Sequence, residues 1–238
     1  MDSFDKSPLD AFIKSPLDAR NSPGGILITY SGFPTDGLQA GAEAIADQVR
    51  PVYASIGQSV DPQGVFNGSL ASYRLVIHAL GIRSDPVTGA ISQIAPEPWF
   101  SQLPTYSGRI IWLTDSYAVG PVQNPPPDTS GKLSLNSINS LTGMTVGGVT
   151  SSVFYSTRSH PLTAGCFALL GESLAALLTG GNPLTQSSVV HENTAGQTSF
   201  VIHGGSFLLN RRLTSASGEL RASAEQFLRN LWTVPIGG

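Results

Sequence analysis

The sequence predicts an α/β fold: a doubly wound, mostly parallel sheet that carries an extended N-terminal arm. Continuous apolar runs, typical of parallel strands buried on both faces, alternate with segments whose apolar residues have helical spacing. The first 25 residues are instead rich in Pro, Ser and Asp and hold few large apolar side chains. We therefore expect a partner-binding arm over residues 1–25 and a single α/β domain over residues 26–238.

The arm contains one six-residue word twice. Residues 6–11 and 14–19 both read Lys-Ser-Pro-Leu-Asp-Ala, and a degraded copy, Asn-Ser-Pro, follows at 21–23. The proline of each word fixes φ and lacks a backbone N–H, and it moves the preceding serine out of the helical region. Each word is therefore expected to be extended or turn-like.

Apolar side chains are regularly spaced along this arm, as they are in peptide ligands. Extended peptides gain affinity from main-chain hydrogen bonds and specificity from pockets for spaced side chains, and two linked copies raise the effective concentration of the second. The alternative is an idle linker duplicated by slippage. The residues that we expect to bind a partner are Phe4, Lys6, Pro8, Leu9, Asp10, Phe12, Lys14, Pro16, Leu17 and Asp18.

The composition and the net charge exclude several classes of function and several kinds of site. Charged residues make up 12% of the chain, about half the usual share, and the formal net charge is -3 with no basic tract. The charge argues against nucleic-acid binding, and the low charge content suits a subunit covered by neighbours or an extracellular protein. A single cysteine excludes an intrachain disulfide framework and a cysteine zinc site. We expect no signal peptide and no membrane span, because no suitable apolar run is found.

The first half of the domain alternates strand and helix patterns. The run 26–30 ends at Ser31 and Gly32, as a buried strand would, and residues 35–49 have apolar positions at helical spacing with Pro51 just beyond. Further strands are expected at 52–56, 75–80 and 109–113, and a short helix at 68–73. This succession is the plan of a doubly wound sheet.

The second half is less regular. The Pro-rich segment 124–128 is a loop, and glycines at 180 and 181 end a helical pattern. The terminal helix carries Leu220, Ala224, Phe227 and Leu231 on one face. Helices are expected at 133–141, 167–178 and 219–232, and strands at 153–155, 188–192 and 199–203, the last two as a hairpin.

The order of motifs resembles the class I glutamine amidotransferase-like, flavodoxin-like superfamily, and most closely its non-amidotransferase branches. The resemblance is carried by LVIHALGI as the third strand, RIIWLTDS as the fourth, a late SHPLTAG segment, SFVIHGGSFLLN and the terminal ASAEQFLRNLW. It covers most of residues 25–234 and implies a flavodoxin-like sheet. The SPLDA words are similar to those at the starts of some bacteriophage virion and tail proteins, which implies a virion role.

Enzymes of that superfamily need a nucleophile on a tight turn after a strand, activated by a histidine and a carboxylate. The matching turn, residues 114–118, holds no cysteine and no glycine. His160 and Pro161 resemble the family's His-Pro-Glu, but Leu162 stands in place of the glutamate. Cys166 precedes an apolar, helix-like segment, which predicts a buried, inert thiol. We therefore expect no catalytic residue.

Other candidate sites are open to two interpretations. A hydrolase triad of Ser116, His160 and Asp115 is the alternative to a chain without catalytic residues. The glycines at 204 and 205 indicate a turn, with anion binding by backbone N–H groups as the alternative. Histidines in strand-like runs are expected to be hydrogen-bonded core or edge residues rather than metal ligands: His78, His191 and His203. Aromatic residues near strand ends are expected in the core, with a sugar pocket as the alternative: Trp99, Phe100, Trp112 and Tyr117.

The function that the sequence favours is a structural or adaptor subunit of a larger assembly. We expect a bacteriophage virion protein of the tail, fibre or capsid-associated kind, which docks through its arm and forms homo- or hetero-oligomers. It would need no cofactor, metal, nucleic acid or membrane, and it would reside in the virion, or alternatively in the cytoplasm. The alternative function is a hydrolase or a small-ligand or glycan-binding protein of the amidotransferase-like superfamily.

Overall fold

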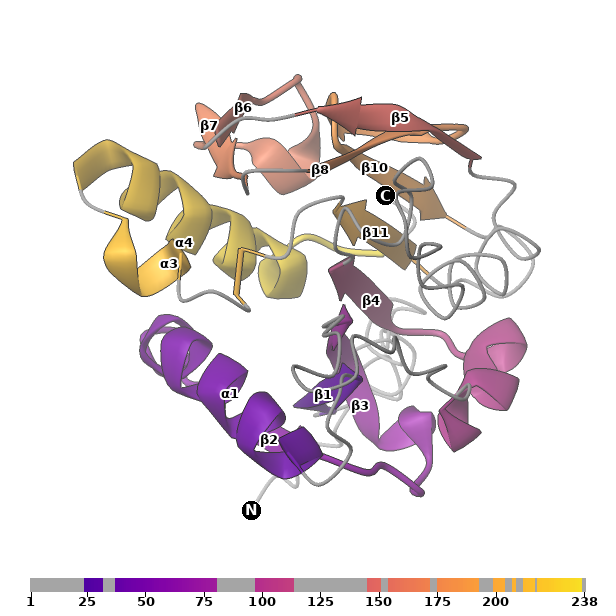
Figure 1. The fold of residues 1–238 in the computed structure, drawn as a ribbon. Coiled ribbons are helices and arrows are strands. Elements are labelled where there is room, and N and C mark those ends of the chain that lie inside the picture. The colour runs from indigo at the N-terminus through magenta and orange to yellow at the C-terminus, as the bar shows by residue number, and fades with distance from the viewer. Residues whose placement is uncertain are drawn as a thin grey trace, which may run out of the picture.

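The computed structural model has a mixed α/β fold built on a seven-stranded, mostly parallel sheet (Figure 1). The residues that it describes are 24–31, 37–80, 97–113, 145–150, 154–171, 175–192, 199–203, 207–208, 212–216 and 218–236. The strands of this sheet are β1 (Gly25–Ser31), β2 (Val60–Gln63), β3 (Tyr73–Leu80), β4 (Arg109–Leu113), β9 (Asn182–Thr185), β10 (Ser188–Glu192) and β11 (Ser199–His203).

The strand order is β2-β1-β3-β4-β11-β10-β9. The first five strands in this order are parallel, and β10 is antiparallel to both of its neighbours. Two small antiparallel pairs lie outside the sheet: β5 (Thr145–Thr150) with β8 (Ala175–Thr179), and β6 (Phe154–Ser156) with β7 (Ala168–Leu170). The expected α/β class and mostly parallel sheet are thus confirmed.

The two faces of the sheet bury different partners. Helices α1 (Leu38–Ala54) and α4 (Gly218–Thr233) cover one face (Figure 1), where they pack on alternate strand residues such as Ile26 and Ile28. The other face packs on the 3₁₀ helix η5 (Pro98–Thr105) through Leu27, Val76 and Trp112. In the described part of the chain, the other helical elements are η4 (Leu70–Ser72), η7 (Pro161–Thr163) and α3 (Arg212–Ser215).

Helix α1 is longer than the sequence predicts, and the strand expected at 52–56 is wrong. The helix continues through Pro51 to Ala54, and the second strand is β2. Pro51 is exposed, whereas the two residues after it, Val52 and Tyr53, are buried and extend the apolar stripe of the helix. The free energy gained from this burial offsets the loss of the backbone hydrogen bond that a proline within a helix removes.

The helix expected at 167–178 is also wrong. The segment forms β7 and, after a break, β8. All three residues of β7 are buried, and Ser223 of α4 hydrogen bonds to both the amide nitrogen and the carbonyl oxygen of Ala168. Tertiary hydrogen bonding of this kind replaces the bonds that a helix would have supplied, and it overrides the helical pattern.

Most of the other expected elements are present in the structure. The helix at 219–232 and the strands at 26–30, 75–80, 109–113, 153–155, 188–192 and 199–203 are confirmed within two residues, as is the antiparallel pairing of the last two. A 3₁₀ helix, η4, lies in the short helix expected at 68–73. The helix expected at 133–141 lies outside the described residues. No helix in the described part is long and apolar enough to cross a bilayer.

Candidate functional site

The carboxyl ends of β1 and β3 meet where the direction of winding reverses. The chain passes from β1 through α1 to β2 on one side of β1, and then returns to β3 on the other side. Ser31 and Leu80, the last residues of β1 and β3, are paired in register. Ligands of open α/β sheets bind outside the carboxyl ends of strands at such a switch point, so a ligand site is expected first at this edge.

A serine and a glutamate are hydrogen-bonded at this edge. Ser31 Oγ donates to Glu97 Oε1 over 2.6 Å. Ser31 is buried, whereas Glu97 keeps part of its surface exposed. Glu97 is the N-cap residue of η5, but its side chain caps no helical N–H, and the buried Trp99 two residues later anchors η5 in the core. The packing of η5 therefore holds the carboxyl group against the end of β1.

Burial raises the pKa of Glu97 above the ordinary value, and the hydrogen bond from Ser31 opposes part of this shift. None of the ion pairs in the described part of the chain involves Glu97. A partly buried carboxyl group with a raised pKa can accept a hydrogen bond from a ligand, donate one when protonated, or take a proton from a neighbouring hydroxyl. Shifted carboxyl groups in such places are frequent at functional sites.

A second polar pair lies two residues deeper on the same two strands. Thr29 Oγ1 and His78 Nδ1 are 2.8 Å apart across β1 and β3. His78 is fully buried, and burial lowers its pKa to about 3, so its imidazole is neutral. Its ring centroid lies 4.3 Å from that of Trp112, 5.3 Å from Trp99 and 5.8 Å from Phe100. His78 is thus the hydrogen-bonded core histidine that the sequence indicates.

This cluster belongs to the core. Trp99 and Trp112 have no exposed surface, which agrees with their expected core role and leaves no ring face for a sugar. The buried nitrogens His78 Nε2, Trp99 Nε1 and Trp112 Nε1 have no hydrogen-bond partner among the described residues. The cluster fixes the position of the candidate site, because Trp99 is packed in the cluster and Glu97 belongs to the same short segment as Trp99.

Cys166 and His160 lie six residues apart in the described chain, and each has its own surroundings. Burial raises the pKa of Cys166 to about 11, so its thiol is protonated at neutral pH, but the residue is partly buried and not fully buried as expected. It precedes β7 and not a helix. His160 is the N-cap residue of η7, and its Nδ1 accepts a hydrogen bond from the Leu162 amide at 3.1 Å. This bond uses the ring nitrogen for a local backbone contact.

Several predicted residues lie outside the described part of the chain. The turn residues Asp115, Ser116 and Tyr117 are among them, as are the glycines at 204 and 205. His191 lies partly buried on β10, and His203 ends β11. All the expected partner-binding residues of the arm also lie outside it, namely Phe4, Lys6, Pro8, Leu9, Asp10, Phe12, Lys14, Pro16, Leu17 and Asp18. Their roles stay predictions.

The sequence interpretation missed the pairing of Ser31 with Glu97. One signal for Ser31 was present, because it is the polar residue that ends a buried strand just before a glycine. Glu97 gave no comparable signal. It is 66 positions away, in a Pro-containing segment, and only the packing of η5 brings it to Ser31. The described residues include no group of three or more His, Cys, Asp or Glu side chains that could hold a metal ion.

Comparisons with known proteins assign no family to the chain. No family model matches, and no curated protein matches either. Among solved structures, the exo-β-1,4-mannosidase Op5Man5 from Opitutaceae bacterium strain TAV5 has a TM-score of 0.47 and 10% identity over 87% of this chain. A β-galactosidase from the psychrophilic Marinomonas ef1 has a TM-score of 0.42 and 14% identity over 87% of this chain. This chain covers 35% and 29% of their respective lengths, and at these scores neither likeness assigns a fold or an activity.

Proposed function

We propose that this chain is a structural or adaptor subunit of a larger assembly, a bacteriophage virion protein of the tail, fibre or capsid-associated kind, and that residues 1–23 dock it to neighbouring subunits. The observation that carries this proposal is the exact repetition of Lys-Ser-Pro-Leu-Asp-Ala at 6–11 and 14–19. Two identical linked words suit two equivalent binding sites on a partner.

The place where the arm joins the body supports this division of roles. β1 begins at Gly25 and has a hydrogen-bonded strand on each side, so the arm is attached to an inner strand of the sheet. At Gly24, a Cβ atom would come within 2.6 Å of the Arg74 amide nitrogen, so the chain enters β1 in close contact with β3. The arm thus leaves from the amino edge of the sheet, opposite the edge that carries Ser31 and Glu97.

Deletion of residues 1–23 tests the proposal. The shortened chain should fold, because the described core begins at Ile26, but it should no longer co-sediment with the particles that contain the full chain. Leu9→Ser and Leu17→Ser should each weaken incorporation to a similar extent, and the double variant should abolish it. Matched substitutions of Ser3 and Ser22 by Ala should leave incorporation unchanged. Normal incorporation of the deletion variant would refute the docking role.

A second candidate function is favoured by the Ser31–Glu97 pair: a hydrolase or a small-ligand or glycan-binding protein of the amidotransferase-like, flavodoxin-like superfamily. The strand order β2-β1-β3-β4, continued by the parallel β11, supports a flavodoxin-like arrangement. In this function Glu97 would accept a proton from Ser31 or from a ligand hydroxyl group at the switch point.

A panel of esters, amides and soluble glycans tests the second candidate. Activity or binding that is lost in both Ser31→Ala and Glu97→Gln, but kept in Ser55→Ala and Glu43→Gln, would support it. The variants Ser116→Ala, His160→Ala and Cys166→Ala then distinguish a site at the switch point from the other sequence candidates. If the panel gives activity that depends on one of these three and not on Ser31 or Glu97, the switch-point assignment is wrong.

A further inference from the structure

We propose that residues 157–166 form a binding site for a tetrahedral oxyanion, the phosphate or sulfate group of a small molecule. The segment contains the His-Pro-Leu-Thr sequence, whose role neither proposed function explains. It lines a hollow of about 490 Å³ that is open to solvent, and this volume is within the range of small-molecule sites. The proposal is independent of the arm and of the Ser31–Glu97 pair.

The side chains that line this hollow offer donors and no carboxylate. Arg158, Ser159 and His160 are three consecutive lining residues, and among the described residues that line the hollow none is acidic. Arg158 is exposed and takes part in none of the ion pairs found in the described residues. Its guanidinium group presents a fork of N–H donors that matches an oxyanion. The positive charge of Arg158 in this hollow therefore suits an anion.

The hydrogen bonding of His160 determines which ring nitrogen can donate. Nδ1 accepts from the Leu162 amide, so the neutral ring carries its proton on Nε2. Nε2–H is then the donor of the neutral ring, on the residue two positions after Arg158. Cys166 also lines the hollow, and its high pKa keeps the thiol neutral, so it does not repel an anion.

The backbone around the hollow is fixed by contacts on several sides. Asn230 of α4 donates from Nδ2 to the carbonyl oxygens of Leu162 and Ala164, at 3.0 and 2.8 Å. The Arg158 amide donates to Leu184 O of β9 at 2.7 Å. Gly165 has a φ of 75°, a left-handed conformation that favours glycine and turns the chain from η7 back toward β7. These contacts shape the hollow before any ligand binds.

The same contacts place the hollow away from the switch point. Asn230, which holds η7, precedes Leu231, whose carbonyl oxygen bonds to Arg109 at the amino end of β4. Ser31 and Glu97 lie at the carboxyl ends of the parallel strands. β7 packs against α4 and pairs with β6 at the border of the fold (Figure 1), so the site belongs to a different part of the body from that pair.

Titration of the full chain with inorganic phosphate and with sulfate, followed by amide NMR, tests the proposal. At constant ionic strength set with chloride, we expect saturable shifts of the amides of residues 157–166 at millimolar anion. Arg158→Gln should weaken binding by about five-fold, the upper range for an exposed charge pair. His160→Gln should also weaken it. Arg50→Gln, which removes an exposed arginine from α1, should leave the affinity unchanged.

Three outcomes would overturn the proposal. The first is the absence of saturable shifts in 157–166 with either anion. The second is an equal loss of affinity in Arg158→Gln and Arg50→Gln, which would show general charge attraction. The third is tighter binding of acetate than of sulfate, which would show a carboxylate site instead. Thermal unfolding of each variant, compared with the unaltered chain, identifies any loss of binding that comes from unfolding.

Discussion

At the scale of single residues, Arg109 is a charged group buried in the core. It is 1% exposed, and its guanidinium donates to the carbonyl oxygens of Leu231, Val234 and Pro235 and to Ser199 Oγ, at 2.7 to 3.1 Å. These carbonyl groups end α4 and follow it, where helical carbonyl oxygens lack partners and cations are favoured. The first residue of β4 thus holds the last turn of the C-terminal helix.

Arg109→Lys should lower the free energy of unfolding by about 2–3 kcal/mol, because an ammonium group cannot reproduce the fork of hydrogen bonds. Urea unfolding measures this change. Arg50→Lys on exposed α1 is the matched control and should stay within about 0.5 kcal/mol of the unaltered chain. If the two variants had equal stability, the carbonyl cluster would not depend on the guanidinium.

Glu97 should make stability fall as pH rises. Burial raises its pKa in the folded chain, so the folded state binds the proton more tightly than the unfolded state. Stability is therefore lost between the ordinary value of 4.5 and the raised folded value. Glu97→Gln accepts the Ser31 hydrogen bond without a charge, so we expect it to exceed the unaltered chain in stability at pH 7.

Urea midpoints of the two proteins between about pH 4 and pH 8 check this prediction, and the gap should narrow toward the acid end. Glu43→Gln, on the exposed side of α1, controls for the loss of a surface charge. A Glu97→Gln variant that is less stable than the unaltered chain at pH 7 would contradict the expected direction. It would show that the carboxylate is stabilised in the folded state.

At the scale of elements, the strands buried on both faces could be predicted from sequence alone. β1, β3 and β4 are within two residues of their expected bounds, because burial of both faces leaves a continuous apolar run. The end of α1 and the start of β7 could not be predicted. Val52 and Tyr53 have the composition of a strand, and only their contact with the core makes them helical. Glu97 at the candidate site is positioned by packing too.

The β7 strand depends on one side chain of α4. Ser223 Oγ accepts from the amides of Phe167 and Ala168, at 3.1 and 3.2 Å, and donates to the Ala168 carbonyl oxygen. Ser223→Ala should cost about 1–3 kcal/mol, because it leaves buried backbone groups unpaired. Amide exchange at 167 and 168 should speed up more than exchange in β1. Unchanged exchange at 167 and 168 would show that β7 does not depend on Ser223.

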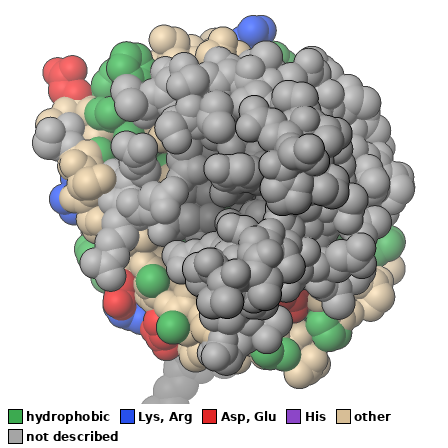
Figure 2. All heavy atoms as spheres, in the orientation of Figure 1, with side chains coloured by type: hydrophobic (Ala, Val, Ile, Leu, Met, Phe, Trp, Pro, Cys, Tyr) green, Lys and Arg blue, Asp and Glu red, His purple; other side chains and the backbone are tan. Residues whose placement is uncertain are grey.

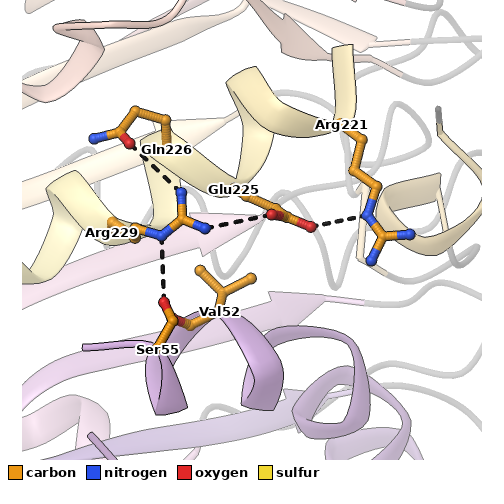
Figure 3. Close-up of polar contacts among 6 residues, drawn as sticks. All are labelled: Val52, Ser55, Arg221, Glu225, Gln226 and Arg229. Atoms are coloured by element: carbon orange, nitrogen blue, oxygen red, sulfur yellow. Dashed lines mark hydrogen bonds and ion pairs between the residues drawn. The ribbon is translucent and has the colours of Figure 1, made fainter. Parts of the chain in front are cut away.

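The polar contacts on the surface of α4 contribute much less. Glu225 pairs with Arg221 and Arg229 within α4, and Arg229 Nε donates to Ser55 Oγ, on the C-cap residue of α1, at 3.4 Å (Figure 3). All of these groups are partly or largely exposed, and exposed pairs contribute about 0–1 kcal/mol. The helices are held together by the apolar cluster beneath them.

On the face in Figure 2, the visible charged side chains of the described residues are scattered around the rim.

At the scale of the whole molecule, one sheet separates two apolar clusters. The cluster under α1 and α4 extends from Ile26 to Leu231, and the cluster under η5 contains Trp99 and Trp112. Adjacent residues of each inner strand enter opposite clusters, for example Ile26 and Leu27. Loss of β1, β3 or β4 would therefore open both clusters together. The expectation that residues 26–238 form a single domain stays a prediction.

Unfolding of the two faces should accordingly be one transition. The chain has three tryptophans, and Trp232→Phe leaves fluorescence to Trp99 of η5 and Trp112 of β4, while far-UV circular dichroism follows α1 and α4 on the opposite face. Phenylalanine keeps a ring beside Arg74, whose guanidinium carbon lies 4.9 Å from the Trp232 ring centroid. In urea, the two signals should give the same midpoint. Separate midpoints would show that the faces unfold independently and that residues 26–238 hold more than one cooperative unit.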